Sequence, residues 1–516
     1  MQSKLKNHFI KILLFLPLIL NFGKRSYIAY DEGFYALQAK WILQTNNWII
    51  PVWWDEYNLD RTIGIQFLIA KSQQIFGQSS FAAHLPTTIA AALMLLLTYK
   101  LHQELISKKE AIISTLILAT TYIWLDFAHL ATQDMIFACL VTFGIYSLTQ
   151  LKKENNSIYL FTSGLWIGLA FMMKTFLIAI PLLALLPYII YKRKTLNNQF
   201  FWLGIFIGLL PFGIWSFSIN QYIDKHIIFY LIDKFNNLSG NNNFTNPFYY
   251  YLWNIPLNFF PWSIFTIIGI SYQFRSNKKI SYLLIYFPIL FIFILSLFST
   301  KTPYYVLPIS SILSINAYIG LKKLILNEKL QTLLIQCTTK LIPFFIFCSS
   351  FIYFLIGRKS TGLNLKEEFI LFSGLTITAI ILIFIKETKN YKSILLTFMI
   401  LPYLIGTSLV QSGLLTDRSR ELRETIEYIF TKEDINNTFI KVISPNSADN
   451  NSISKLIKIS LLTPNLGKGI KELKDLNISE FAWIKDTQNS NFSKKNYEII
   501  ASNKTLNPWK LIKRKE

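Results

Sequence analysis

Two adjacent acids, Asp31 and Glu32, are the first residues of this sequence whose types could do chemistry. They stand in the segment from Tyr30 to Tyr35, soon after an apolar run near the N-terminus. Charged groups close to hydrocarbon are costly, so a functional role is a reasonable default. An aspartate is also a good helix N-cap, and the two acids could simply cap the helix that follows. On these residues alone, the two interpretations are evenly balanced.

The stretch after these acids predicts an amphipathic helix. Residues 33–43 place apolar side chains among polar ones at helical spacing. Its apolar positions are Phe34, Leu37, Trp41 and Ile42. Such a helix would lie along the membrane surface, and it would hold Asp31 and Glu32 toward any polar headgroup there.

Three further sites carry charge beside apolar segments. Asp60-Arg61 would by default be a solvated ion pair, which is worth little. Asp134 stands at the mouth of an apolar run. Lys174 lies between two apolar stretches, where a lysine could snorkel harmlessly or bind a phosphate as a point charge.

Lys301 and Tyr305 lie close together later in the chain, on either side of Pro303. A tyrosine at a helix end most often belongs to the aromatic belt at the membrane surface. Taken one at a time, all of these residues are at best evenly balanced between a functional and a structural interpretation.

The composition places these residues in a membrane protein. Of 516 residues, 52% are hydrophobic and only 16% are charged, whereas soluble domains carry about 25% charged residues. The formal net charge of +22 fits basic cytoplasmic loops. No soluble segment combines a basic block with interleaved aromatics, so we exclude nucleic-acid binding. The three cysteines lie within apolar runs, and their spacing indicates neither a metal site nor a disulfide framework.

Hydropathy and length predict about thirteen transmembrane helices. They lie near 8–22, 81–103, 111–127, 133–151, 157–173, 176–191, 200–219, 251–274, 279–298, 304–325, 336–356, 369–385 and 393–412. With the N-terminus in the cytoplasm, the loops after the even-numbered helices are basic, as the positive-inside rule requires. Arg358-Lys359 fits less well, because it would lie outside. The odd count places the C-terminus outside as well.

This topology brings the candidate residues to one face of the membrane. The outward-facing set is Asp31, Glu32, Asp60, Arg61, Asp134, Lys174, Lys301 and Tyr305. Acids and cations together suit a reaction on a lipid phosphate. A carboxylate can take a proton from an acceptor hydroxyl, and Lys or Arg can stabilise the charge of a departing phosphate.

The chain changes character at about residue 413. We predict a transmembrane catalytic domain over residues 1–412 and an extracytoplasmic soluble domain over 413–516, which contains no spanning run. Residues 416–431 have helical spacing, and the short strands are predicted at 439–443, 480–484 and 497–501. About a hundred residues suffice for a small α/β domain, and this one contains no catalytic motif.

Several motifs occur in an order that resembles bacterial members of the dolichyl-phosphate-mannose–protein mannosyltransferase superfamily, with the lipid A aminoarabinose transferases nearest in kind. The match begins with DEGFYALQAKWILQ and continues through ATQDMIFACL, GLAFMMKTFLIAIPLLALLP, NPFYYYLWNIPLNFFPWS and STKTPYYVLP. It covers most of residues 25–310. The resemblance implies an all-α polytopic GT-C fold with interfacial helices in the outer loops, followed by a small soluble domain.

The resemblance also implies a function, which is transfer of a sugar from a polyprenyl-phosphate carrier at the outer face of the plasma (inner) membrane, with inversion of the anomeric centre. The catalytic pair would be Asp31 and Glu32, in which Asp31 acts as general base or orients the acceptor and Glu32 supports it. Arg61, Lys174 and Lys301 would bind the carrier phosphate. The supporting residues would be Asp60, Asp134 and Tyr305.

This chain departs from the family pattern at three places. The family's Phe-x-Lys-Pro-Pro run is replaced by residues 59–63, which keep a cation at Arg61 but lack the prolines. The Thr-Lys-Gly pattern lacks its glycine after Lys174. Some relatives bind metal through a histidine before the Pro-aromatic segment, and residues 243–247 contain no histidine. A divalent metal is therefore the one cofactor considered, and the histidine-lacking segment does not support it, so we predict no metal site.

The sequence as a whole predicts an inverting glycosyltransferase whose acceptor is lipid A, another glycan, a lipid or a protein. One alternative is a flippase or transporter, which would favour ionisable residues and broken helices near the middle of the membrane. A second alternative is a non-catalytic protein that only binds a lipid-linked sugar. Charges gathered at one face and a long first outer loop favour the enzyme.

Overall fold

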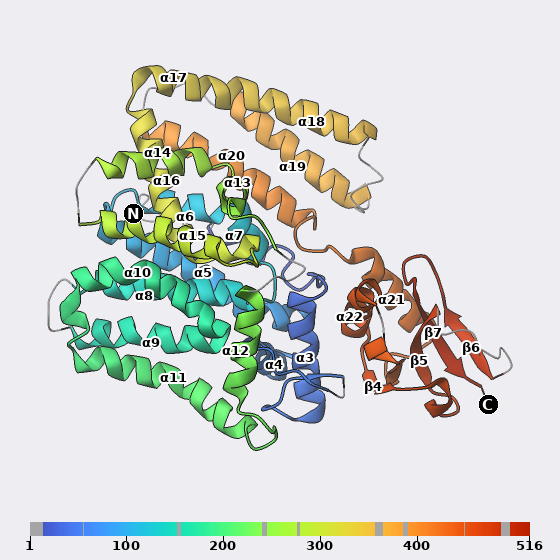
Figure 1. Ribbon diagram of the computed structural model, residues 1–516. Helices are drawn as coiled ribbons and strands as arrows, with labels where there is room; N and C mark the ends of the chain where they lie inside the picture. Colours follow the sequence, from blue (N-terminus) through green and yellow to red (C-terminus); the bar gives the residue numbers. More distant parts are fainter. Residues whose placement is uncertain are drawn as a thin grey trace.

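The helices of this protein form one large bundle, and a smaller body that contains a sheet lies beside it (Figure 1). The computed structural model describes residues 14–54, 56–151, 156–239, 245–275, 279–356, 365–384, 391–447, 449–486 and 496–515. The first part of the helix predicted near 8–22 and the pair Arg358-Lys359 lie outside the described residues.

The bundle is built from two successive sets of helices. The first set is α2 (Leu16–Ile19), α3 (Asp31–Thr45), α4 (Gly64–Phe76), α5 (Ser80–Leu105), α6 (Ala111–Ala119), α7 (Tyr122–Phe127), α8 (Gln133–Thr149), α9 (Ser157–Lys174), α10 (Ala179–Tyr191) and α11 (Gln199–Ile219). The second set is α12 (Ile227–Ser239), α13 (Tyr250–Asn258), α14 (Ser263–Phe274), α15 (Phe287–Leu297), α16 (Ser310–Ile325), α17 (Glu328–Gln336), α18 (Ile342–Ile356), α19 (Leu365–Phe384) and α20 (Tyr391–Gln411).

Shorter elements join some of these helices. A hairpin of β1 (Val52–Trp53) and β2 (Glu56–Tyr57) stands between α3 and α4. The 3-10 turn η1 (Thr175–Ile178) follows α9, and η4 (Pro303–Ile309) precedes α16.

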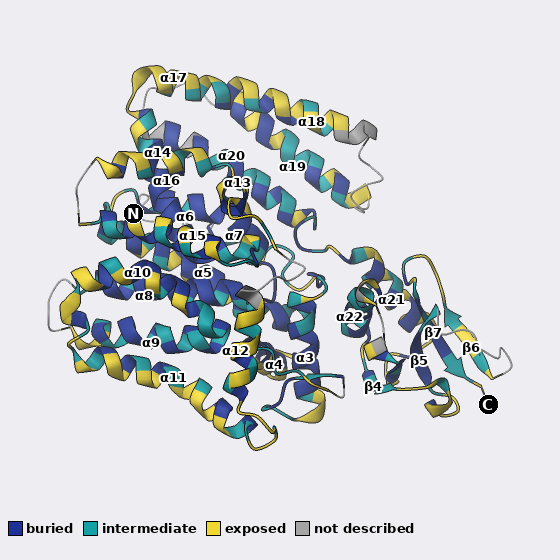
Figure 2. Cartoon of the chain, in the orientation of Figure 1, coloured by how far each residue is buried: buried dark blue, intermediate teal, exposed yellow. Residues whose placement is uncertain are grey.

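The outer helices of the bundle expose apolar side chains. Figure 2 shows exposed residues along α11, α17 and α18. They include Trp202, Phe206 and Phe217 on α11, and Phe344 and Phe345 on α18. Contiguous apolar surface of this kind marks an interaction or membrane surface. Together with the apolar helices, it makes this a multi-pass membrane protein.

The predicted count of thirteen transmembrane helices is not confirmed. Among the described residues, six helical stretches are long and apolar enough to cross a membrane, and a seventh is added if α13 and α14, which meet at 114°, form one broken span. One reason is that apolar runs contain breaks. The predicted helix 111–127, for example, is divided at Thr120-Thr121 into α6 and α7. Hydropathy measures composition over a window, so such breaks leave little trace in it.

Glycines let α9 and α11 approach each other closely. Gly164 and Gly168 of α9 face Gly204 and Gly208 of α11. A Cβ atom added to Gly168 would lie 2.2 Å from the carbonyl carbon of Gly208, so a larger residue does not fit there. Small residues four apart are a common packing device between membrane helices. This contact fixes the position of α9, whose last residue is Lys174.

The predicted small α/β unit is present in the C-terminal region. Its elements are α21 (Arg420–Lys432), β3 (Ile440–Ile443), α22 (Asn450–Leu462), β4 (Leu466–Ile470), β5 (Phe481–Lys485), β6 (Tyr497–Ala501) and β7 (Trp509–Arg514). The strand order is β4-β3-β5-β7-β6, with β3 parallel to β4 and β5, and β7 antiparallel to β5 and β6. The elements α21, β3, β5 and β6 lie where the sequence predicts a helix and strands, whereas α22, β4 and β7 lie where it predicts none.

The two faces of this sheet have separate cores. One face packs with α21 and α22, and its core includes Val442, Trp483 and Leu456. The same core takes in Leu37 and Trp41 from α3 of the membrane bundle. The opposite face has a smaller core that includes Ile484 and Ile512.

Candidate active site

Asp31 is the first residue of α3, and the chain reaches it through a strained residue. Tyr30 has a φ of 61° and a ψ of −118°, a region that residues other than glycine rarely adopt. Such strain persists where the surrounding structure enforces it, and it clusters at functional sites. The carboxylate of Asp31 also lies at a helix N-terminus, where the helix dipole favours negative charge.

The surroundings of Asp31 make its carboxylate a stronger base than that of a free aspartate. Burial and the nearby negative charge of Asp134 raise the pKa of Asp31. The positive charges of Arg61, Lys174 and Lys234 act in the opposite direction without cancelling that rise. A carboxylate whose pKa moves toward the working pH is better suited to accept a proton.

Arg61 is held in a fork by the carboxylate of Asp60. Its Nε and Nη2 atoms each donate to an oxygen of Asp60 at 3.0 Å, and its Nη1 donates to the Tyr35 hydroxyl at 2.9 Å. Lys234 of α12 pairs with the same carboxylate at 3.1 Å. Burial would raise the pKa of Asp60, but the charges and hydrogen bonds of Arg61 and Lys234 hold it below its usual value. The single carboxylate of Asp60 pairs with two cations. This group therefore has a net positive charge, which acts on Asp31.

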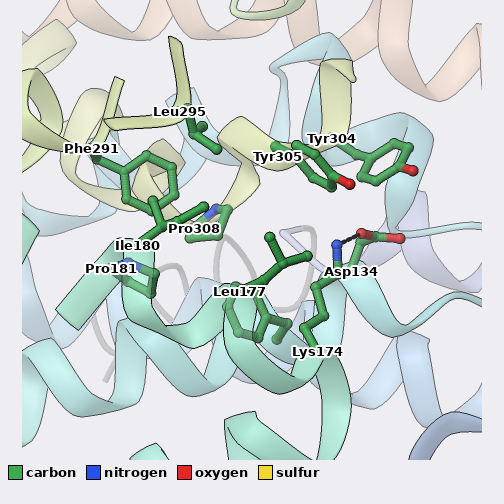
Figure 3. Close-up of a pocket in the computed structure, with 11 residues that line it drawn as sticks. Asp134, Lys174, Leu177, Ile180, Pro181, Phe291, Leu295, Tyr304, Tyr305 and Pro308 are labelled. Carbon is green, nitrogen blue, oxygen red and sulfur yellow. Dashed lines mark ion pairs between the residues drawn. The ribbon is translucent and has the colours of Figure 1, made fainter. Parts of the chain in front are cut away.

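Lys174 and Asp134 form a second, deeply buried ion pair. Figure 3 shows the Lys174 ammonium directed at the Asp134 carboxylate, and the two side chains are only 5% and 6% exposed. The rings of Tyr304 and Tyr305 each lie 4.9 Å from Lys174 Nζ. An ammonium over an aromatic face is attracted by the ring quadrupole. The lysine is therefore fixed by one carboxylate and two rings.

The ion pair of Lys174 and Asp134 lies where helices end or begin. Lys174 ends α9, and Thr175 after it has a φ of 48° and a ψ of −129°, so the helical path stops there. This break lies where sequence analysis separated the fifth and sixth predicted helices. Asp134 belongs to the first turn of α8, and both tyrosines belong to η4. Three elements thus meet at Lys174.

The ion pair and the tyrosines line a narrow pocket with an empty volume of about 310 Å³. Its other walls are apolar, and they include Leu177, Ile180 and Pro181 from η1 and α10 (Figure 3). An ion pair with apolar walls is poorly screened by water.

A second, larger apolar pocket has an empty volume of about 1200 Å³. Residues of α4, α8, α9 and α11 line it, including Met173, and Ile63 just before α4 also belongs to its lining. Ile63 follows Arg61 by two residues, and Met173 directly precedes Lys174. The Thr62 hydroxyl donates to the Met172 carbonyl at 2.7 Å, which joins the two charged segments at the edge of this pocket.

Glu32 points into the protein. Its carboxylate is fully buried and is contacted by His84 Nε2 at 2.7 Å. It also accepts the backbone N–H groups of Ala131 at 2.7 Å and Ile28 at 2.9 Å. These contacts tie α3 to α5 and to the segment before α8. The geometry supports a structural role for Glu32 rather than a share in the reaction.

Lys301 is also engaged away from the two charged pairs. Its ammonium donates to the backbone carbonyls of Asn246 at 2.8 Å and Phe298 at 2.5 Å. In return, the Asn246 amide donates to the Lys301 carbonyl at 3.0 Å. The lysine thus joins the segment before α13 to the turn before η4, and its predicted contact with a phosphate would require these bonds to break.

The donors near Asp31 do not fit a divalent cation. No three His, Cys, Asp or Glu side chains are grouped like metal ligands in the described part of the chain. Asp60 and Asp134 are each paired with a cation already. Residues 243 and 244 of the histidine-lacking segment 243–247 lie outside the described part.

Sequence analysis missed three side chains of this site. Lys234 lies in a loop segment of mixed charge, and only its position on the amphipathic helix α12 could have drawn attention to it. Tyr35 and Tyr304 look like ordinary aromatic neighbours of Asp31 and Tyr305 in the sequence. Their roles depend on contacts with Arg61 and Lys174 that no local pattern encodes.

The comparisons with known proteins bear on the family resemblance and on the fold. Residues 60–216 match the dolichyl-phosphate-mannose-protein mannosyltransferase family. The crystal structure of ArnT from Cupriavidus metallidurans bound to undecaprenyl phosphate superimposes with a TM-score of 0.75 at 14% identity, covering 99% of this chain and 97% of that one. The chain has the fold of ArnT. The predicted GT-C fold and the resemblance to lipid A aminoarabinose transferases are therefore confirmed.

Two curated relatives extend the comparison. The undecaprenyl phosphate-α-4-amino-4-deoxy-L-arabinose arabinosyl transferase of Wigglesworthia glossinidia brevipalpis is 28% identical over 342 residues, which cover 63% of this chain and 60% of the relative. A Proteus mirabilis protein described in the same words is 25% identical over 313 residues, covering 58% and 56%. The chain thus aligns with less than two thirds of the length of either relative.

Proposed function

We propose that this protein is an inverting glycosyltransferase that moves a sugar from a polyprenyl-phosphate carrier to an acceptor at the outer face of the plasma membrane. The observation that carries the proposal is the electrostatic setting of Asp31. A carboxylate of raised pKa lies in the field of three cations, and residues close in the sequence to two of these cations line the large apolar pocket. A lipid phosphate has the matching chemistry, an anionic head on an apolar chain.

The proposed reaction is a single displacement. The oxygen or nitrogen nucleophile of the acceptor bonds to the anomeric carbon of the sugar. Asp31 accepts the proton that this nucleophile loses. The bond from that carbon to the phosphate oxygen breaks on the opposite face, and its electron pair stays on the phosphate. The anomeric centre is inverted, and the products are the glycosylated acceptor and the polyprenyl phosphate.

The cations stabilise the leaving phosphate. Arg61 offers a planar fork that matches a phosphate bidentately, and Lys234 lies beside it on the Asp60 carboxylate. Lys174 is held ready by Asp134 and the two tyrosines. Charged donors in a partly dry site stabilise developing charge more strongly than they would in water. The apolar pocket would take the isoprenoid chain next to these groups.

The relatives guide the choice of substrates. Their names make the undecaprenyl phosphate ester of 4-amino-4-deoxy-L-arabinose the first donor to test. Lipid A, one of the acceptors expected from the sequence, is the first acceptor to test. A pentose of this kind is our preferred sugar over a hexose. We further propose that the N-terminus lies in the cytoplasm and that the C-terminal domain, together with Asp31, lies outside.

Transfer and transport can be separated in one experiment. The purified protein, reconstituted in liposomes with the undecaprenyl-linked aminoarabinose and lipid A, should produce modified lipid A detectable by mass spectrometry. The same liposomes report movement of the carrier between leaflets. Modified lipid A supports the proposal. Carrier movement without modified lipid A would indicate a flippase instead of an enzyme. Binding of the donor with neither carrier movement nor modified lipid A would indicate a binding protein.

A further inference from the structure

The helix that begins with Asp31 is covered by the C-terminal domain. Ten of the fifteen residues of α3 are buried, and the contacts come from two sides. One side packs on α4 within the membrane bundle, and the other packs on α22 of the C-terminal domain. The position of Asp31 therefore depends on an element more than 400 residues away in the sequence.

The two helices contact each other at three levels. A Cβ atom added to Gly33, two residues after Asp31, would lie 2.6 Å from Ile457 Cγ2, so Ile457 packs directly on the first turn of α3. In the middle, Lys40 Nζ donates to the backbone carbonyls of Thr463 at 2.5 Å and Ser460 at 3.3 Å. At the end, the Gln44 amide donates to the Leu466 carbonyl at 3.2 Å.

Burying the charged side chain of Lys40 between α3 and α22 is energetically unfavourable. It is 7% exposed, and no carboxylate pairs with it among the described residues. Burial lowers the pKa of Lys40 to about 8. Its partners are carbonyls at the C-terminal end of α22, where a cation also meets the negative end of the helix dipole. A buried lysine with such partners contributes geometry more than stability, because desolvating its charge offsets much of the attraction.

The apolar contacts reinforce this arrangement. Leu37 and Trp41 of α3 are buried in the same core as Leu456 and Ile459 of α22. Trp54, from the turn after β1, completes this core and packs against Trp41 with ring centroids 5.0 Å apart. The α3 helix is thus part of the core of the C-terminal domain and of the membrane bundle at once.

We propose that the C-terminal domain is a positioning element of the active site, which acts through Lys40 and Ile457 on α3 and thereby sets the place of Asp31. Neither residue touches the reacting groups. The domain fixes the distance between Asp31 and the cations, which belong to the membrane bundle. This inference rests on the proposed function, since it assigns Asp31 the role of base.

The first test compares Lys40→Met with Lys40→Arg in the full chain. Loss of the contact should lower kcat by about 10- to 100-fold, since a displacement of about 1 Å is enough for such losses. The affinity for undecaprenyl phosphate should fall much less than kcat, because Asp60 and Asp134 hold the cations and α3 contributes one hydrogen bond, from Arg61 to Tyr35. Lys40→Arg still offers N–H donors to the carbonyls of Thr463 and Ser460, so it should restore most of kcat. Wild-type kcat in Lys40→Met, or an equal loss in affinity, would overturn the proposal.

The second test keeps the proposal falsifiable if Lys40→Met does not fold. Ile457→Ala removes the contact with Gly33, and Ile512→Ala truncates an equally buried isoleucine on the opposite face of the sheet. Hydrogen exchange measured without any substrate should rise in the first turns of α3 for Ile457→Ala only. Equal exchange in both variants would overturn the positioning role. If hydrogen exchange in α3 rises for Ile457→Ala only, but the wild type transfers no sugar, the proposed function is wrong. The positioning of α3 by the C-terminal domain is then still supported.

Discussion

The guanidinium of Arg61 lies in a fork formed by the carboxylate of Asp60, the residue directly before it in the chain, with both hydrogen bonds at 3.0 Å. The fork shows how Arg61 would grip a phosphate, because a carboxylate presents two oxygens in a similar plane. It also shows that a phosphate must compete with Asp60 for this cation.

Replacing Arg61 by lysine keeps the charge but removes the fork. Hydrogen bonds to charged groups contribute about 1.5–3 kcal/mol, so we expect Arg61→Lys to bind undecaprenyl phosphate at least about 10-fold more weakly. Equilibrium binding in detergent measures this. Arg423→Lys is the control, because Arg423 of α21 pairs with Asp417 outside the site. Equal affinities for wild type and Arg61→Lys would remove Arg61 from the phosphate site.

Lys174→Met should harm both stability and activity. It leaves the Asp134 carboxylate buried without its partner, and breaking one partner of a buried pair costs about 3–5 kcal/mol. The double variant Lys174→Met with Asp134→Asn removes both charges, so it should recover most of the thermal stability. Transfer should remain impaired, because the cation is still missing. A double variant with wild-type transfer would show that the pair is purely structural.

Lys234 should influence the pH dependence of the reaction through Asp31. Its positive charge lowers the pKa of Asp31, so its removal raises that pKa further. Asp31 must be ionised to act as base, and the acidic limb of the kcat profile of Lys234→Leu should therefore move to higher pH. Lys234→Arg, which keeps the charge, should leave the limb in place. A shift to lower pH would contradict the electrostatic arrangement.

Glu32→Ala should behave as a stability variant. It leaves the buried donors of His84 and Ala131, and the partly buried N–H of Ile28, without their acceptor, and each buried unsatisfied group costs about 1–3 kcal/mol. We expect a lower thermal midpoint, with undecaprenyl phosphate still bound by the folded fraction. A variant of unchanged midpoint that transfers no sugar would instead place Glu32 in the reaction.

The general plan of the molecule could be predicted from local patterns. Asp31 was recognised because an acid pair beside hydrocarbon is unusual, and Lys174 because it interrupts an apolar run. The break at Thr175 follows the same interruption. Composition and loop charge identified the membrane bundle, and the ordered motifs identified its fold.

The remaining features depend on contacts between distant segments. Nothing near Lys40 predicts that it reaches α22, more than 400 residues later. Glu32 and Asp31 are neighbours in the sequence, but helix geometry turns one toward His84 and leaves the other beside the cations. The count of thirteen spans is not confirmed, and hydropathy alone does not settle it, because a kink such as that between α13 and α14 changes the direction of a helix without changing its hydropathy.

The central claim is that Asp31 is the base. The most direct measurement compares wild type and Asp31→Asn for the rate of sugar transfer to lipid A and, in parallel, for the affinity for undecaprenyl phosphate. Loss of a general base lowers a rate by about 10²–10⁴-fold, so we expect kcat to fall by that much while carrier affinity is kept. Asp31→Asn that transfers sugar at the wild-type rate would contradict the account.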